Sequence, residues 1–159
     1  MIKHITIIGL DPGIADMGFG VIEVRGSQLR CLAVGSIKTS SKMASGERLA
    51  MIYKKLEELI LKFKPTEAGI EKIYFSKNVK TALLVAEARG VIRACLAAHQ
   101  IKIFEYSPQA VKIAVAGAGN ASKNSVGVMV TKLFKLKQIP KPDDAADALA
   151  MALTQAVTR

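Results

Sequence analysis

The sequence predicts an α/β fold in which one mixed sheet is flanked by helices, with the whole chain, residues 1–159, forming a single domain. Two observations lead to this prediction. Three β-type segments follow one another before residue 40, and beyond them helical patterns alternate with short apolar segments. Consecutive strands favour antiparallel pairing, whereas strands separated by helices favour parallel pairing, so one sheet should contain both kinds.

The three N-terminal strands are expected at 5–10, 18–24 and 28–39. The first is a run of apolar β-formers that ends in Asp11, and a Pro-Gly turn leads from it into the second. An Arg-Gly-Ser turn then joins the second segment to the third. This order predicts an antiparallel meander.

A polar loop at 39–46 precedes the first helix, whose apolar residues recur at helical spacing from Leu49 to Phe63. This helix should end before Pro65, because proline cannot continue it. Residues 67–75 then predict a central strand followed by a loop.

The second half of the chain alternates helices and one strand. Residues 78–98 predict a long, Ala-rich helix that is apolar on more than one side, as in a helix shared with a partner. A short strand is expected at 102–106, and Pro108 should open a helix through 115. A further helix is expected around 126–134, and the last lies within 145–157.

Composition indicates a nucleic-acid-binding protein. The chain has 23 Lys and Arg against 13 Asp and Glu, a formal charge of +10 and a pI near 9.8. Such a balance favours a polyanionic partner. No apolar run reaches the roughly 18 residues of a membrane span, and no signal peptide is evident. We therefore expect an intracellular, cytoplasmic protein without membrane contact, in which Cys31 and Cys95 are free thiols.

Four acids stand beside apolar residues in this basic chain: Asp11 at the end of the first strand, Glu71 in the fourth, and Asp144 and Asp147 in the stretch DDAADALA, where the last helix is expected to begin. Each has a structural explanation taken singly, such as a turn, a solvated strand face or a helix cap. If that stretch is helical, Asp144 and Asp147, three positions apart, share one face.

Taken together, these acids predict a metal site. Carboxylates that converge in a buried place repel one another and need cations, and Mg²⁺ is the hard cation suited to carboxylate and phosphate oxygens. Two such ions can hold both oxygens of an in-line phosphoryl displacement. An acidic centre within a basic surface is typical of a metal-dependent nuclease.

The motifs that contain these acids resemble the RuvC family of Holliday junction resolvases, which have the ribonuclease H-like fold. The similar motifs are GLDPG, GIEKIYFSKN, AEARGV, AVAGAGNASK and DDAADALAMAL, in the family's order and spacing. They extend over nearly the whole chain. One such motif is weak support, but five in order are strong.

The resemblance implies that Asp11, Glu71, Asp144 and Asp147 are catalytic and bind two Mg²⁺ ions, with Mn²⁺ as a substitute. It implies a homodimer that cuts a four-way DNA junction with paired symmetric nicks, leaving 5′-phosphate and 3′-hydroxyl ends. In bacteria the family works with the RuvA–RuvB branch-migration complex.

The resemblance also implies several DNA contacts. Lys112 and Lys123 match family lysines near the scissile phosphate, where a lysine acts as a point charge. Tyr74 matches a loop aromatic that lies against bases near the crossover, where an aromatic ring can stack on an unpaired base. Lys77 and Asn78 follow in the same loop and could contact the backbone.

The chain departs from the family pattern at three places. Lys72 stands where the family commonly has Gln or an acid, and could compete with metal or help to hold phosphate. Tyr74 replaces the usual Phe. Asp143 adds an acid beside Asp144, and we assign the inward position to Asp144 because it shares a face with Asp147.

Three alternatives remain at this point. The chain could be another ribonuclease H-like nuclease that acts on RNA, or a non-catalytic protein that only binds junctions. The first strand also resembles the phosphate-binding strand of actin-like ATPases, although that fold needs two such domains and a longer chain. The sequence leaves open the nucleotide preference at the cut, the source organism and the need for a branch-migration partner.

Overall fold

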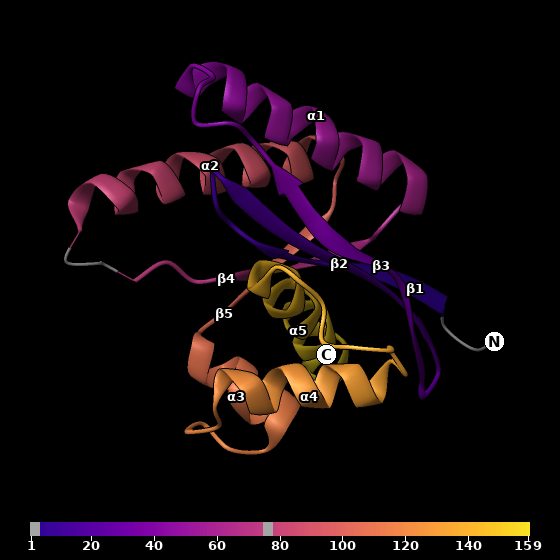
Figure 1. Ribbon diagram of the computed structural model, residues 1–159. Helices are drawn as coiled ribbons and strands as arrows, with labels where there is room; N and C mark the ends of the chain where they lie inside the picture. The colour runs from indigo at the N-terminus through magenta and orange to yellow at the C-terminus, as the bar shows by residue number, and fades with distance from the viewer. Residues whose placement is uncertain (1–3, 75–77) are drawn as a thin grey trace.

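The computed structural model describes residues 4–74 and 78–159 (Figure 1). Its elements follow the predicted order closely. In chain order they are β1 (His4–Asp11), β2 (Asp16–Arg25), β3 (Gln28–Lys38), α1 (Ser45–Phe63), β4 (Glu67–Glu71), α2 (Val79–Ala98), β5 (Lys102–Tyr106), α3 (Pro108–Ala116), α4 (Lys123–Leu133) and α5 (Asp143–Thr158).

The five strands form one mixed sheet in the order β3-β2-β1-β4-β5. The first three strands pair antiparallel, whereas β4 runs parallel to β1 and β5 parallel to β4. The predicted fold class is therefore confirmed. Because β1 and β4 are parallel neighbours, their carboxyl ends lie at the same edge of the sheet.

The helices form layers on both faces of the sheet (Figure 1). Helices α1 and α2 cover one face, where Ile52, Leu56 and Ile92 are fully buried against the strands. Helix α5 crosses the other face, with α3 and α4 packed beyond it. A second buried cluster, which includes Leu149 and Val130, fills that side.

Close packing of α5 on the sheet depends on glycines in β1 and β2. A Cβ atom on Gly9 would lie 2.0 Å from the Ala148 carbonyl oxygen, and one on Gly18 would lie 1.9 Å from that of Asp144. Neither strand could carry a larger residue at these points while the helix stays in place. The glycines thus set the height of the acidic end of α5 above β1.

The element boundaries differ from the sequence-based ones by a few residues. The last helix begins at Asp143 rather than near Ala145, so both acids of its first turn are helical. The strand expected at 67–75 ends at Glu71. Within the described residues, no helix is both long and apolar enough to cross a bilayer.

The packing of α5 predicts that Gly9→Ala is strongly destabilising. Its added methyl group meets backbone atoms of Ala148 and Ala152, which cannot move aside without shifting the helix. We expect a loss of about 3 kcal/mol, a fall in Tm of roughly 6–12 °C. Gly46→Ala is the matched control, because a Cβ at Gly46 has nothing within 4 Å. Thermal unfolding of both variants tests this, and equal Tm values would contradict it.

Candidate active site

Asp11 lies at the carboxyl end of β1, where the strand gives way to the turn that begins at Pro12. Its residue surface is only 9% exposed. In the antiparallel pair with β2 it stands opposite Gly18. A carboxylate so buried is costly unless it is hydrogen-bonded, neutralised or paired with a cation.

Three further acids reach the same edge of the sheet from other elements. Leu10 pairs with Ile70 in the parallel ladder, so the next residues, Asp11 and Glu71, come to the ends of adjacent strands. Asp144 and Asp147 lie in the first turns of α5, whose backbone approaches β2 at Gly18. Asp11 is hydrogen-bonded to both Glu71 and Asp144, and it feels the charge of Asp147.

Burial and mutual repulsion raise the pKa of Asp11 to about 8. Loss of hydration is the largest cause, followed by the negative charge of Glu71 and then the hydrogen bond with Asp144. Without a metal ion, Asp11 thus keeps its proton at neutral pH. That proton can be donated in a hydrogen bond to one neighbouring carboxylate.

Lys123 supplies positive charge at the edge of this cluster. Its Nζ lies 2.9 Å from Asp147 Oδ2 and 3.8 Å from Asp143 Oδ2. Burial raises the pKa of Asp147 and of Glu71, while Lys123 opposes the rise at both. The hydrogen bond to Asp147 in turn raises the pKa of Lys123 above its ordinary value.

The donor set fits a hard divalent cation, although the side chains are not yet arranged as ligands. Carboxylate oxygens are the ligands that Mg²⁺ and Mn²⁺ prefer. The proton kept on Asp11 and the pairing of Lys123 with Asp147 both offset negative charge that a bound cation would also offset. As they lie, no three His, Cys, Asp or Glu side chains among the described residues form a group able to hold a metal.

A cleft of about 220 Å³ opens beside the acids. Glu71 and Asp147 line one side, and Lys112 of α3 and Lys123 of α4 supply positive charge. Apolar residues complete the wall: Pro108, Val111, Val126, Ala150 and Met151. Sequence patterns identify these apolar residues only as helix core, because the pattern does not show which of them border a cavity.

Glu71 also borders a second cleft, of about 260 Å³, which contains Lys72 and Tyr74. Tyr74 is 60% exposed, so this residue is accessible to a ligand. Asn78 caps α2, since its side chain accepts a hydrogen bond from the Thr81 N–H at 3.2 Å. Lys77, the remaining residue predicted to contact DNA, lies outside the described residues.

The two neighbouring aspartates at the start of α5 have different surroundings. Asp144 is half-buried and hydrogen-bonds to Asp11, whereas the Asp143 side chain is 82% exposed. The structure thus brings Asp144, with Asp11, Glu71 and Asp147, to one place. Asp143 pairs with Lys123 at 3.8 Å from this exposed position.

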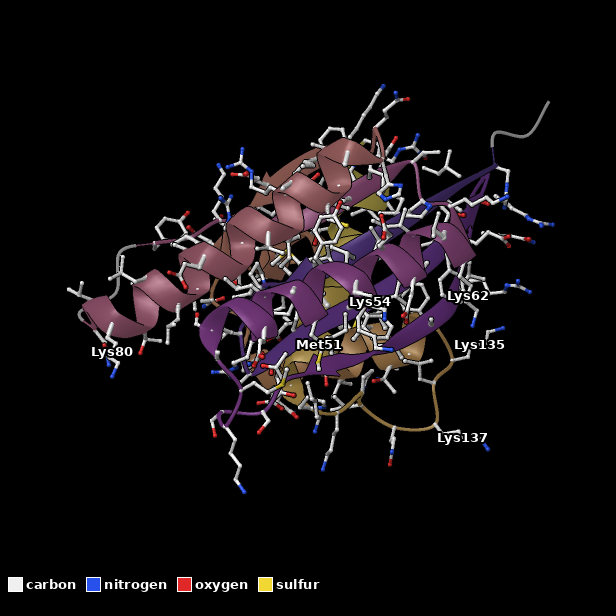
Figure 2. The ribbon with its side chains drawn as sticks, turned by 90° about the horizontal axis from the view of Figure 1, so that it is seen from above. Met51, Lys54, Lys62, Lys80, Lys135 and Lys137 are labelled. Carbon is white, nitrogen blue, oxygen red and sulfur yellow. The ribbon has the colours of Figure 1, made fainter. Side chains whose placement is uncertain are left out.

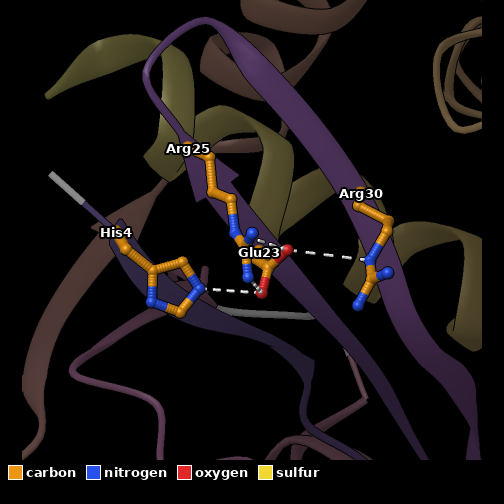
Figure 3. Close-up of polar contacts among 4 residues, drawn as sticks. All are labelled: His4, Glu23, Arg25 and Arg30. Carbon is orange, nitrogen blue, oxygen red and sulfur yellow. Dashed lines mark hydrogen bonds and ion pairs between the residues drawn. The ribbon is translucent and has the colours of Figure 1, made fainter. Parts of the chain in front are cut away.

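A separate group of charged residues lies at the opposite end of β1 and β2 (Figure 3). Glu23 accepts from His4 Nε2 at 2.7 Å and pairs with Arg25 and Arg30. The hydrogen bond from His4, with the two arginines, keeps the pKa of Glu23 below its ordinary value. His4 begins the strand that Asp11 ends, so this group does not belong to the acidic site.

The sequence is similar to one well-defined family. A family model described as "Crossover junction endodeoxyribonuclease RuvC" matches residues 7–155. The protein of that name from Alkaliphilus metalliredigens is 47% identical over 150 residues, covering 94% of this chain and 92% of its own. That of Treponema denticola is 46% identical over 149 residues, covering 94% and 84%.

Solved structures agree with this similarity. The Thermus thermophilus RuvC in complex with Holliday junction substrate aligns with a TM-score of 0.92 and 34% identity, covering 97% of this chain and 94% of that one. The yeast mitochondrial Holliday junction resolvase Ydc2 aligns with a TM-score of 0.64 at 16% identity, which shows a shared fold only.

The raised pKa of Asp11 predicts how stability depends on pH in the absence of metal. The folded protein holds this proton up to about pH 8, whereas the unfolded chain releases it near pH 3.8. Stability should therefore fall as pH rises between these values. Asp11→Asn keeps a neutral group there, so with EDTA at pH 8 it should exceed the wild type by about 2 kcal/mol or more, roughly 4–8 °C in Tm.

At pH 4 the two proteins should differ far less. Asp16→Asn is the control, because its carboxylate lies on β2 in partial contact with solvent, 3.9 Å from Lys38. Urea or thermal unfolding across pH 4–8 gives the comparison. An Asp11→Asn advantage that does not grow with pH would mean that Asp11 is not protonated in the metal-free protein.

Proposed function

This chain belongs to the RuvC family of crossover junction endodeoxyribonucleases, and from that we propose that it cuts four-way DNA junctions. The proposed reaction is phosphodiester hydrolysis by paired symmetric nicks that leave 5′-phosphate and 3′-hydroxyl ends. In a bacterial cell, we propose the RuvA–RuvB branch-migration complex as its partner.

The observation that supports this proposal most is the meeting of four carboxyl groups at one edge of the sheet. Asp11, Glu71, Asp144 and Asp147 come from three separate segments and depend on the β1–β4 pairing and on the close approach of α5. A cluster that raises the pKa of Asp11 to about 8 lowers stability at neutral pH. Such a costly arrangement is typical of a functional site.

We propose that the four acids hold two divalent ions, Mg²⁺ or Mn²⁺. Bound there, such ions would polarise the phosphate, lower the pKa of a water molecule and stabilise the leaving oxygen. The protein's own part is to hold the carboxylate oxygens in place on three rigid elements, β1, β4 and α5. Asp143 is excluded from this set because its side chain faces solvent.

The cleft lysines are proposed to hold the scissile phosphate. Lys112 and Lys123 line the same 220 Å³ cleft as Glu71 and Asp147, from α3 and α4. A lysine offers a compact charge with rotatable donors, which suits phosphate oxygens in varied orientations. Tyr74, exposed in the second cleft beside Glu71, is proposed to stack on a base near the crossover.

Two alternatives have weaker support. A related nuclease acting on RNA would use the same acids, but the similar proteins described above are named for crossover junctions in DNA. A protein that only binds junctions would not benefit from four converging acids, because negative charge near phosphate weakens binding unless a cation screens it. Junction DNA and an RNA precursor offered separately distinguish the first alternative.

We further propose that the protein acts as a homodimer, since two symmetric nicks need two sites. The first half of α2 extends beyond the sheet (Figure 1), and its buried residues begin only at Ala88. Val79 and Leu83 in that half are 68% and 61% exposed. Apolar side chains gathered on a projecting helix are typical of a subunit interface.

The catalytic assignment predicts that Asp11→Asn cuts a four-way junction about 1,000-fold more slowly or worse, a loss of about 4 kcal/mol in transition-state stabilisation. Junction binding should be kept, because the substitution removes a negative charge. Chelation of divalent metal should abolish cutting by the wild type, with recovery on adding Mg²⁺. A labelled mobile junction separated on gels reports all three.

Asp143→Asn is the matched control for this experiment. It removes the same charge one residue before Asp144, but from an exposed position. Its cutting rate should stay within about threefold of the wild type, equivalent to under 1 kcal/mol. Normal cutting by Asp11→Asn would show that the acid cluster is not the catalytic centre.

The dimer proposal predicts that Leu83→Glu shifts the protein to monomers and replaces paired nicks by single ones. Leu61→Glu on α1 is the control, since Leu61 is 62% exposed, nearly the same as Leu83, but lies away from the projecting half of α2. Sedimentation velocity gives the mass, and a supercoiled cruciform plasmid separates nicked from linear product. A wild type that sediments as a monomer with and without DNA would contradict the proposal.

A further inference from the structure

More than half of the chain's net positive charge comes from one continuous stretch. Residues 106–142 contain six lysines and no Asp or Glu. They form α3, α4 and the segment that leads into α5, on the face of the sheet opposite α1 and α2 (Figure 1). The lysines are Lys112, Lys123, Lys132, Lys135, Lys137 and Lys141.

The segment after α4 is anchored by its apolar residues, so its lysines are held outward. Phe134 is buried, Leu136 packs against the same core, and Ile139 lies close over Gly127, 3.1 Å from where a Cβ would be. The lysines at 135, 137 and 141 alternate with these anchors and are exposed. Figure 2 shows Lys135 and Lys137 extending from the end of the molecule opposite Lys80.

These lysines lack the acidic partners that many other basic residues have. Among the described residues, none of the four from Lys132 to Lys141 forms an ion pair within 4.0 Å. Elsewhere, by contrast, Lys55 Nζ lies 3.1 Å from Glu58 Oε2 and Arg25 Nε lies 3.2 Å from Glu23 Oε2. Like charges gathered without partners raise the local potential, which attracts a polyanion.

The lysines are continuous with the acidic site. A cleft of about 330 Å³ is lined by Lys123, Asn124 and Lys141 together with Asp143 and Asp147. Helix α4 begins at Lys123 and has 11 residues, so its last turn lies about 15 Å further on. Lys132, Lys135 and Lys137 follow there, which makes a path of positive charge leading away from the acids.

Resting on the proposed function, we propose that this path, made by Lys132, Lys135, Lys137 and Lys141, holds the phosphate backbone of a duplex arm of the junction beyond the cut. Lysine point charges suit phosphates and carry no base preference. Phe134, which is buried, is the one aromatic residue in 107–142, so this surface has no ring on which unpaired bases could stack. A duplex therefore fits it better than a single strand.

The test measures how salt affects the binding of a linear duplex and of a four-way junction. The variant is Lys132→Gln, Lys135→Gln and Lys137→Gln combined. The slope of log K against log salt is negative, and each lost phosphate contact should make it less steep by about 0.9. For the triple variant we therefore expect the slope to become less steep by about 2–3. Cutting at saturating protein should remain, because none of the three lines the acidic cleft.

Two controls separate position from total charge. Lys54→Gln, Lys62→Gln and Lys102→Gln together remove three exposed charges from α1 and β5, and should lower the slope by less than about 1. Figure 2 shows Lys54 and Lys62 on α1. Arginine at 132, 135 and 137 keeps the charge and should keep the slope.

The proposal would be overturned if the two glutamine variants showed the same salt dependence of binding. It would also be overturned if the arginine variant showed as weak a salt dependence as the glutamine variant at the same three positions. If the proposed function were wrong, the wild type would leave junctions uncut. The salt dependence of binding to plain duplex would still show whether these lysines contact DNA. Circular dichroism and Tm show whether the glutamine variants are folded. A variant that unfolds would be replaced by the single Lys137→Gln, for which a decrease of about 1 is expected and an unchanged slope counts against the proposal.

Discussion

The repulsion among carboxylates at the end of β1 is the constraint on which the rest of the structure depends. Asp11 is held between Glu71 and Asp144 in a place that water scarcely reaches, and it keeps a proton up to about pH 8. Lys123 offsets part of the charge on Asp147. Both features indicate excess negative charge at this site. A site that binds divalent cations has such an excess when no cation is bound.

Backbone packing, rather than side-chain contacts, keeps these groups together. The parallel pairing of β1 with β4 fixes the distance between Asp11 and Glu71, and glycines let α5 settle directly on the strands. Electrostatic repulsion would push the end of α5 away, but Leu149 and Leu153 bury the helix in the core below. Hydrophobic burial of α5 thus opposes the strain that the acids create.

The sequence was sufficient for the sheet, for its helices and for the meeting of the four acids. Strands and helices here have strong patterns, and the end of a parallel strand is a predictable place for a polar residue. The sequence was not sufficient to predict which of those acids is protonated. Helical spacing did place Asp144, rather than Asp143, on the face of Asp147, and Asp144 is half-buried whereas Asp143 is exposed. The proton that Asp11 keeps was not predictable, because it depends on burial and on the charge of Glu71, which comes from a separate element.

Contacts between distant side chains were also beyond the sequence. The His4–Glu23 contact and the Lys123–Asp147 pair each join residues about 20 or more positions apart, and no local pattern marks either of them. The second cleft beside Glu71, with Tyr74 and Lys72, depends in addition on Val85 of α2. Such cavities arise from the way whole elements pack, so a pattern within one element does not reveal them.

The distribution of charge argues that the high pI is more than a means of solubility. Residues 106–142 carry +6 of the net +10, although they are under a quarter of the chain. Lysines spread for solubility would stand among acids, as they do on α1, where Glu57 and Glu58 accompany Lys54 and Lys55. Positive charge placed instead in one layer beside an acidic cleft creates a field with a direction, as the proposed binding of a junction arm requires.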